Sequence, residues 1–191
     1  MHYVRSKRFQ ATRFISTISI AVATFSGSVE SANGKESVSP ELRAESLATL
    51  RSVMQTQERW VKVHAAEWLL ALGYPEGVVE EFRRELSEHG EEPEYRIGIW
   101  RVLSKVPQSP SESAEWLAKI EEVFQNEDSP DRIHAAETLA KLQAELSPKL
   151  IASAKLAAKG GNHRLAGYLT WLLFVADKEH RDEHLHNLLA L

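Results

Sequence analysis

From Pro40 onward, apolar residues recur at intervals of three and four, the spacing that places side chains on one face of an α-helix. No stretch of this part alternates apolar and polar residues in the way that predicts a half-buried strand. Proline, glycine and serine interrupt the pattern at short intervals and divide it into separate helices. The predicted helices cover residues 40–54, 58–73, 75–88, 93–106, 111–126, 129–143, 147–160, 162–176 and 180–190. The pattern therefore predicts an all-α protein.

Three of the predicted helix starts place a serine directly before a proline, at Ser39-Pro40, Ser129-Pro130 and Ser147-Pro148. A serine hydroxyl at this position accepts a hydrogen bond from a backbone amide that the first turn leaves unpaired. Proline suits the first helical position because it lacks an amide hydrogen and its φ angle is already helical. We therefore expect helices to begin at these three points.

One block of sequence recurs four times along the helical part. Each block begins with a basic residue followed by an aliphatic one, and the basic residues are Lys62, Arg96, Arg132 and Arg164, spaced by 34, 36 and 32 residues. Each block also follows another amphipathic segment, so the repeating unit is a pair of helices. A single pair of short helices cannot bury its apolar stripe, whereas stacked pairs share one continuous core. The repetition predicts an α-solenoid of about four to five antiparallel helix pairs, with no β-sheet.

Two of these blocks, Val61–Leu69 and Asp131–Leu139, place a basic residue before an alanine-rich stretch that ends in leucine. In this they resemble the second helix of HEAT repeats, and within that family the HEAT-like repeats first noticed in bilin lyase proteins. The blocks at Arg96 and Arg164 depart from the pattern, because they carry larger residues at some of its small positions. The resemblance extends over about residues 41–176. It implies a protein-binding scaffold whose second helices line a concave face.

The first forty residues follow a different pattern. A basic segment, residues 1–13, precedes an apolar segment, residues 14–25, and small polar residues come next. This order is typical of a secretory signal peptide, and a disordered or mitochondrial-type leader is the alternative. We expect residues 1–31 to form the signal peptide or disordered leader, 32–39 a linker and 40–191 the HEAT-like solenoid. The expected localisation is therefore export, to the periplasm or the extracellular space.

Charge is divided unevenly along the chain. The 191 residues carry a formal net charge of −4, but residues 1–13 contain four basic side chains and no acidic one. The remainder therefore has 19 basic against 27 acidic residues, a net charge of −8. An acidic body argues against nucleic acid as a partner, because phosphate binding needs a basic surface. No apolar run is long enough for an ordinary spanning helix, so we expect no stable membrane insertion after removal of the leader.

Composition and motifs also restrict the chemistry. Cysteine is absent, which excludes a disulfide scaffold, a thiol nucleophile and a cysteine-ligated metal site. The sequence contains no nucleophile elbow, no phosphate-binding glycine loop and no dinucleotide-binding fingerprint. We therefore expect a non-enzymatic scaffold that has no cofactor and no catalytic residue, and that binds a protein partner through its second helices.

The residues expected to form the partner-binding surface lie in the second helices. Glu67, Arg101 and Glu137 occupy one repeat position, and they predict an exposed acid–base–acid ladder across three stacked helices. Trp60 and Trp68 are the two tryptophans expected to face a partner, since tryptophan beside charged side chains is typical of interaction hot spots. The full expected set is Trp60, His64, Glu67, Trp68, Arg101, His134 and Glu137.

Two arrangements of histidine deserve a test for metal binding, and we assign a metal to neither. Histidine precedes glutamate by three residues at positions 64 and 67 and again at 134 and 137. These two pairs lie two repeats apart, which separates them by at least ~16 Å if the helices pack normally. The segment from His180 to His184 matches the H-x-x-E-H pattern of inverted zinc peptidases. That class needs a third protein ligand far downstream, which this sequence does not supply.

Other interpretations of the same sequence are kept as alternatives. One is an accessory or regulatory repeat domain of a larger enzyme, and another is a metal-dependent hydrolase that uses His180 and His184. The last predicted helix, residues 180–190, resembles the first helix of a fifth pair whose second helix is missing. Its leucines would then be half covered. Either this helix caps the array, or another chain, self-association through this helix, or the lost continuation of a truncated gene product completes it. We favour completion over capping.

Overall fold

The computed structural model describes residues 38–109, 111–160 and 162–190. The chain divides into two units, Met1–Ser37 and Val38–Leu191, and all of the described residues belong to the second. The predicted leader, residues 1–31, and most of the predicted linker, residues 32–39, lie outside the described residues. The leader, the linker and the expected export stay predictions.

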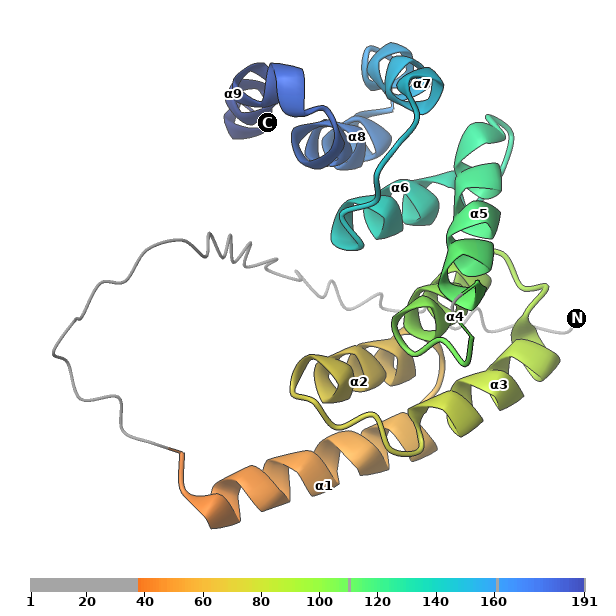
Figure 1. Cartoon of the computed structure of the whole chain (residues 1–191), viewed down its shortest axis with the longest axis vertical. Helices are drawn as coiled ribbons and strands as arrows, with labels where there is room; N and C mark the ends of the chain where they lie inside the picture. The colour runs from red at the N-terminus through yellow and green to blue at the C-terminus, as the bar shows by residue number, and fades with distance from the viewer. Residues whose placement is uncertain (1–37, 110, 161, 191) are drawn as a thin grey trace, which may run out of the picture. The chain divides into compact units, whose positions relative to one another are not determined.

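The described residues confirm the predicted all-α fold (Figure 1). None of them lies in a β-strand, and the helices follow the predicted order closely. The elements are α1 (Pro40–Thr56), α2 (Arg59–Ala71), α3 (Val78–His89), α4 (Tyr95–Lys105), α5 (Glu112–Gln125), α6 (Arg132–Lys141), α7 (Pro148–Ala158), α8 (His163–Ala176), a 3-10 turn (Lys178–His180) and α9 (Arg181–Leu189).

Two of the three predicted serine caps form. The side chains of Ser39 and Ser147 accept hydrogen bonds from the backbone amides three residues further on, at 3.2 and 3.3 Å. The prediction at Ser129 was wrong, because α6 begins at Arg132. The Ser129 hydroxyl instead donates a hydrogen bond of 2.5 Å to the carboxylate of Asp131, so it does not cap the helix. The segment Ser129–Asp131 is therefore a turn that leads into α6.

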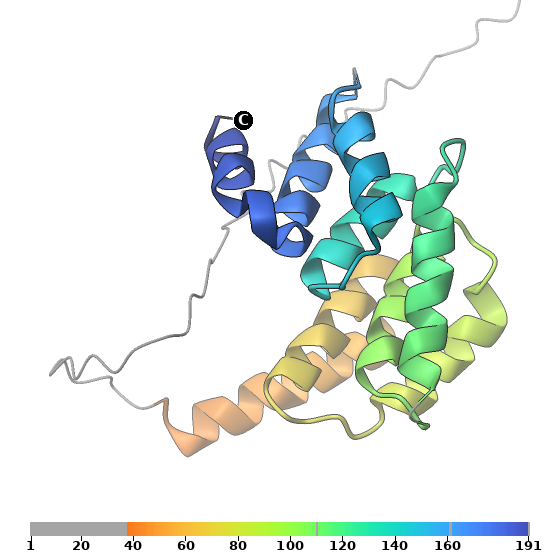
Figure 2. The ribbon, with the colours of Figure 1, turned by 45° about the horizontal axis from the view of Figure 1, so that its top comes forward.

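The helices pack as consecutive pairs. Helices α1, α3, α5 and α7 each contact the helix that follows, and the second helices α2, α4, α6 and α8 contact one another in order. Figures 1 and 2 show the odd-numbered helices from α1 to α7 along one side of this row of second helices. Every second helix between the ends of the row is therefore covered by two others, as expected for an α-solenoid.

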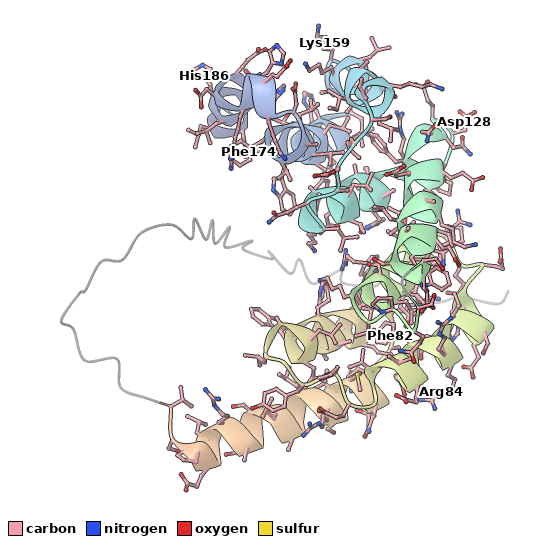
Figure 3. The ribbon with its side chains drawn as sticks, viewed as in Figure 1. Phe82, Arg84, Asp128, Lys159, Phe174 and His186 are labelled. Atoms are coloured by element: carbon pink, nitrogen blue, oxygen red, sulfur yellow. The ribbon has the colours of Figure 1, made fainter. Side chains whose placement is uncertain are left out.

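The core lies between the two helices of each pair and along the row of second helices. Phe82 of α3 is fully buried and points toward α4, whereas Arg84 projects outward from the same helix (Figure 3). Gly98 of α4 marks a close approach between α2 and α4. A Cβ atom at this position would lie 2.9 Å from Val63 Cγ2 and 3.0 Å from Trp60 Cζ3. The absence of a side chain at Gly98 therefore permits the observed spacing of the two helices.

The last helix covers the end of the row. Helix α9 packs against α8, where Leu172 and Leu173 are buried. Two leucines of α9 itself are exposed, Leu185 by 39% and Leu189 by 79%. In the part of the chain that the structure describes, no helix is both long enough and apolar enough to span a membrane.

Candidate functional site

Six of the seven predicted interaction residues come together at the junction of α2, α4 and α6. We call these six residues the inter-repeat cluster, and they are Trp60, His64, Glu67, Arg101, His134 and Glu137. The indole ring of Trp60 connects α2 to α6, since it stacks on the His134 ring with the ring centroids 5.0 Å apart. The two histidine–glutamate pairs, predicted to be separate, are thus joined through one side chain that passes α4.

Arg101 lies at the centre of the inter-repeat cluster, and its side chain is fully buried. Its Nε lies 2.8 Å from Glu67 Oε1, and one of its terminal nitrogens donates a hydrogen bond of 3.1 Å to Glu67 Oε2. The other terminal nitrogen donates to Thr138 Oγ1 at 3.0 Å. The Arg101 guanidinium group, which also lies over the Trp60 ring at 5.5 Å, therefore links α4 to both neighbouring second helices.

The predicted exposed ladder was wrong in two respects. Arg101 is inaccessible, so it cannot contact a partner in this fold. Glu137 pairs with Lys141 of its own helix at 2.7 Å, while Arg101 bonds to Thr138 beside it. The physical reason is depth, because a fully buried guanidinium needs short, directed hydrogen bonds rather than a loose exposed ion pair.

The carboxyl groups of Glu67 and Glu137 both have a lowered pKa. Burial by itself raises the pKa of Glu67, but the hydrogen bond with His64 and the charge of Arg101 outweigh this effect and hold the pKa well below its usual range. Burial also acts to raise the pKa of Glu137, but the nearby His134 ring and the ion pair with Lys141 lower it to about 2. Both groups are therefore carboxylates at neutral pH, and they bind basic side chains of the protein itself.

The exposed part of the inter-repeat cluster is small. The His64 side chain is 53% exposed, whereas the His134 and Glu137 side chains are 22% and 17% exposed. Most of the polar groups in this cluster are thus directed toward one another. The cluster holds successive repeats in register and leaves only His64 well placed to contact another molecule.

Trp68, the seventh predicted residue, lies apart from the inter-repeat cluster. Trp68 is 62% exposed. Tryptophan is a residue type that often dominates the binding energy of an interface. Trp68 borders a groove of about 520 Å³ between α1 and α2. The other residues that line this groove are Leu42, Glu45, Ser46, Thr49, Leu50 and Leu72. We call it the α1–α2 groove.

Sequence reasoning missed the apolar surface around Trp68. Eight large apolar side chains are exposed among the described residues, and five of them lie in α1, in α2, just before α1 or just after α2. Along α2 and at the residue just after it, the exposed ones are Val61, Trp68 and Leu72, whose spacings of seven and four place them on one face. This spacing was visible in the sequence, but it does not reveal whether a neighbouring helix covers that face.

The C-terminal histidines share one carboxylate. Asp177, just after α8, accepts hydrogen bonds from His184 Nε2 at 2.9 Å and from His180 Nδ1 at 3.2 Å, and Lys155 Nζ lies 2.6 Å from it. Burial raises the pKa of Asp177, but its hydrogen bonds with these three basic side chains outweigh that effect and lower the pKa. Within the described residues, no three histidine, aspartate or glutamate side chains are arranged to hold a metal ion. The cluster ties α9 to α7 and α8.

Comparisons with known proteins identify no relative, so a functional proposal depends on the geometry described above. No family model, no curated protein and no solved structure matches this chain.

Proposed function

We propose that this protein is a non-enzymatic scaffold built of HEAT-like repeats, which binds another protein at the exposed face formed by Val61, Trp68 and Leu72 in and just after α2, called here the open edge. The observation that carries the proposal is the exposure of Trp68 beside Leu42 and Leu72 in the α1–α2 groove. A contiguous apolar surface that includes an accessible tryptophan is typical of a protein interaction site.

The inter-repeat cluster supports the same proposal from another direction. Its charged groups, above all Arg101 and Glu67, are used to connect neighbouring helix pairs. The polar residues that suggested chemistry in the sequence therefore have a structural role. Export of the protein remains part of the proposal, and it depends on the signal-like pattern of residues 1–31.

The test is site-specific photo-crosslinking in cells that produce the protein. A photoreactive phenylalanine analogue replaces Trp68, and in a matched control it replaces Leu156, an exposed leucine of α7 that is 73% accessible. We expect position 68 to yield one defined adduct, identified by mass spectrometry, that position 156 does not yield. Equal crosslinking at both positions would contradict the proposed binding edge.

A further inference from the structure

The residues of the open edge have counterparts in the later repeats, and there the same repeat positions are buried. With the repeats aligned on Lys62, Arg96 and Arg132, the position of Trp68 corresponds to Val102 in α4 and to Thr138 in α6. Both of these residues are fully buried, whereas Trp68 is 62% exposed. The same chain thus shows this repeat position in a covered and in an uncovered state.

A second position on the same face shows the same difference. Val61 corresponds to Tyr95 in α4 and to Asp131 before α6. Tyr95 is 2% exposed and Asp131 is 0% exposed, but Val61 is 53% exposed. Asp131 accepts a hydrogen bond from Arg96 of α4, the preceding second helix. Tyr95 is covered by Glu85 of α3 as well as by Arg59 of α2. Position 61 thus agrees with position 68, and part of its cover in α4 comes from the first helix of the same pair.

The structure also shows which kind of element covers this face elsewhere. Thr138 of α6 accepts a hydrogen bond from Arg101 of α4, the preceding second helix. Gly98 of α4 is approached by Trp60 and Val63 of α2, again the preceding second helix. In each case the covering element is an α-helix, so the shape of the open edge fits a helix as well.

The charges near the open edge restrict that helix further. Glu45 is exposed, and it is the only charged side chain among the described residues that line the α1–α2 groove. The chain after residue 13 has a net charge of −8. If a second copy met this groove with its own, Glu45 would find no basic side chain among the described residues that line it, so the pairing would lack charge complementarity.

We propose that the α1–α2 groove binds an amphipathic α-helix of a partner protein, with an apolar stripe that packs on Trp68 and Leu72 and a lysine or arginine that pairs with Glu45. This helix takes the place that a preceding second helix would have in the row. The inference rests on the proposed scaffold function and specifies the class of partner for the same edge.

The probes are two synthetic peptides of 13 residues, the length of α2. One is an amphipathic helix of leucine and lysine, and the other has the same leucines with glutamate in place of lysine. Fluorescence anisotropy with the full chain at physiological salt measures both affinities. We expect the leucine–lysine peptide to bind about tenfold more tightly or better, and Trp68→Ala to weaken it by a similar factor. The matched control, Leu156→Ala, should leave the affinity unchanged.

A charge reversal separates a specific site from general attraction to an acidic protein. Glu45→Lys should reduce the preference for the leucine–lysine peptide several-fold, because the exposed carboxylate that pairs with lysine is replaced by a like charge. An unchanged preference, or binding that is insensitive to Trp68→Ala, would overturn the proposal. It would also be overturned by sedimentation showing a dimer that Trp68→Ala dissociates. If neither peptide binds but position 68 still crosslinks to one protein in cells, the scaffold proposal stands and the proposed partner class is wrong.

Discussion

Arg101 illustrates how a charged residue is accommodated in the core of a helical repeat protein. Its guanidinium group is fully buried, yet it contacts the carboxylate of Glu67, the hydroxyl of Thr138 and the ring of Trp60. Isolated burial of such a charge is very costly, and these partners offset the cost. Lys105 approaches the same carboxylate at 3.2 Å from a side chain that is 34% exposed. One carboxylate thus has a buried and a partly solvated cationic partner.

This pair of cations allows a direct prediction at the scale of the residue. Arg101→Met should lower the free energy of unfolding by about 3 kcal/mol, because Glu67 loses its buried partner. Lys105→Met should cost less than about 1 kcal/mol, since that cation is partly exposed and screened by solvent. Urea unfolding followed by circular dichroism measures both values. Equal effects of the two substitutions would show that burial does not decide the contribution of each pair.

At the scale of the element, the contact between α2 and α4 depends on small size at one position. Gly98 is in the middle of a helix, where glycine is intrinsically unfavourable by about 1 kcal/mol relative to alanine. Its position is explained by the approach of Val63 and Trp60. The Trp60 ring passes this point and stacks on His134, so the close approach also permits a contact between the first and third second helices.

Gly98→Ala should therefore destabilise the protein in spite of the better helix propensity of alanine. The new Cβ atom would lie 2.9 Å from Val63 Cγ2, and overpacking of this kind costs about 1–3 kcal/mol. Thermal unfolding of the single and double variants measures the effect. In a Val63→Ala background, where the obstructing methyl group is gone, the cost of Gly98→Ala should fall. An equal cost in both backgrounds would contradict the steric explanation.

At the scale of the whole described unit, contacts run mainly between neighbours in the row of helices. In such an array a substitution destabilises mainly the helices next to it and has little effect on the stability of the helices at the far end. The two ends differ in their surfaces. Helix α9 is held against α7 and α8 by the cluster around Asp177, whereas Val61, Trp68 and Leu72, in and just after α2, are exposed.

The C-terminal end should respond to acid through Asp177. The folded state lowers the pKa of this carboxyl group, so its contribution to stability is complete above the ordinary aspartate pKa of about 4 and is lost as the pH falls through the lower folded value. At neutral pH, Asp177→Asn should speed amide hydrogen exchange in α9 by about tenfold and leave exchange in α2 unchanged. The matched control is Asp182→Asn, which alters an exposed acid in the first turn of α9. Equal acceleration by both variants would contradict the role of Asp177.

The positions and pairing of the helices followed from the sequence alone, because both depend on local information. Spacings of three and four define helical faces, and serine before proline located the starts of α1 and α7 at Ser39 and Ser147. The recurring basic residues marked the period of the helix pairs. Ser129 shows the limit of such local rules, since its hydroxyl donates a hydrogen bond to the neighbouring Asp131 carboxylate instead of capping a helix.

Only the tertiary structure decided which residues are buried and which are available. Trp68 and Thr138 occupy the same repeat position, but one is exposed and the other is buried, because α6 has a second helix before it and α2 has none among the described elements. For the same reason Arg101, predicted at an exposed position, is enclosed between α2 and α6. Periodicity specifies the face of a helix on which a side chain lies. Whether that face is covered depends on its neighbours in space.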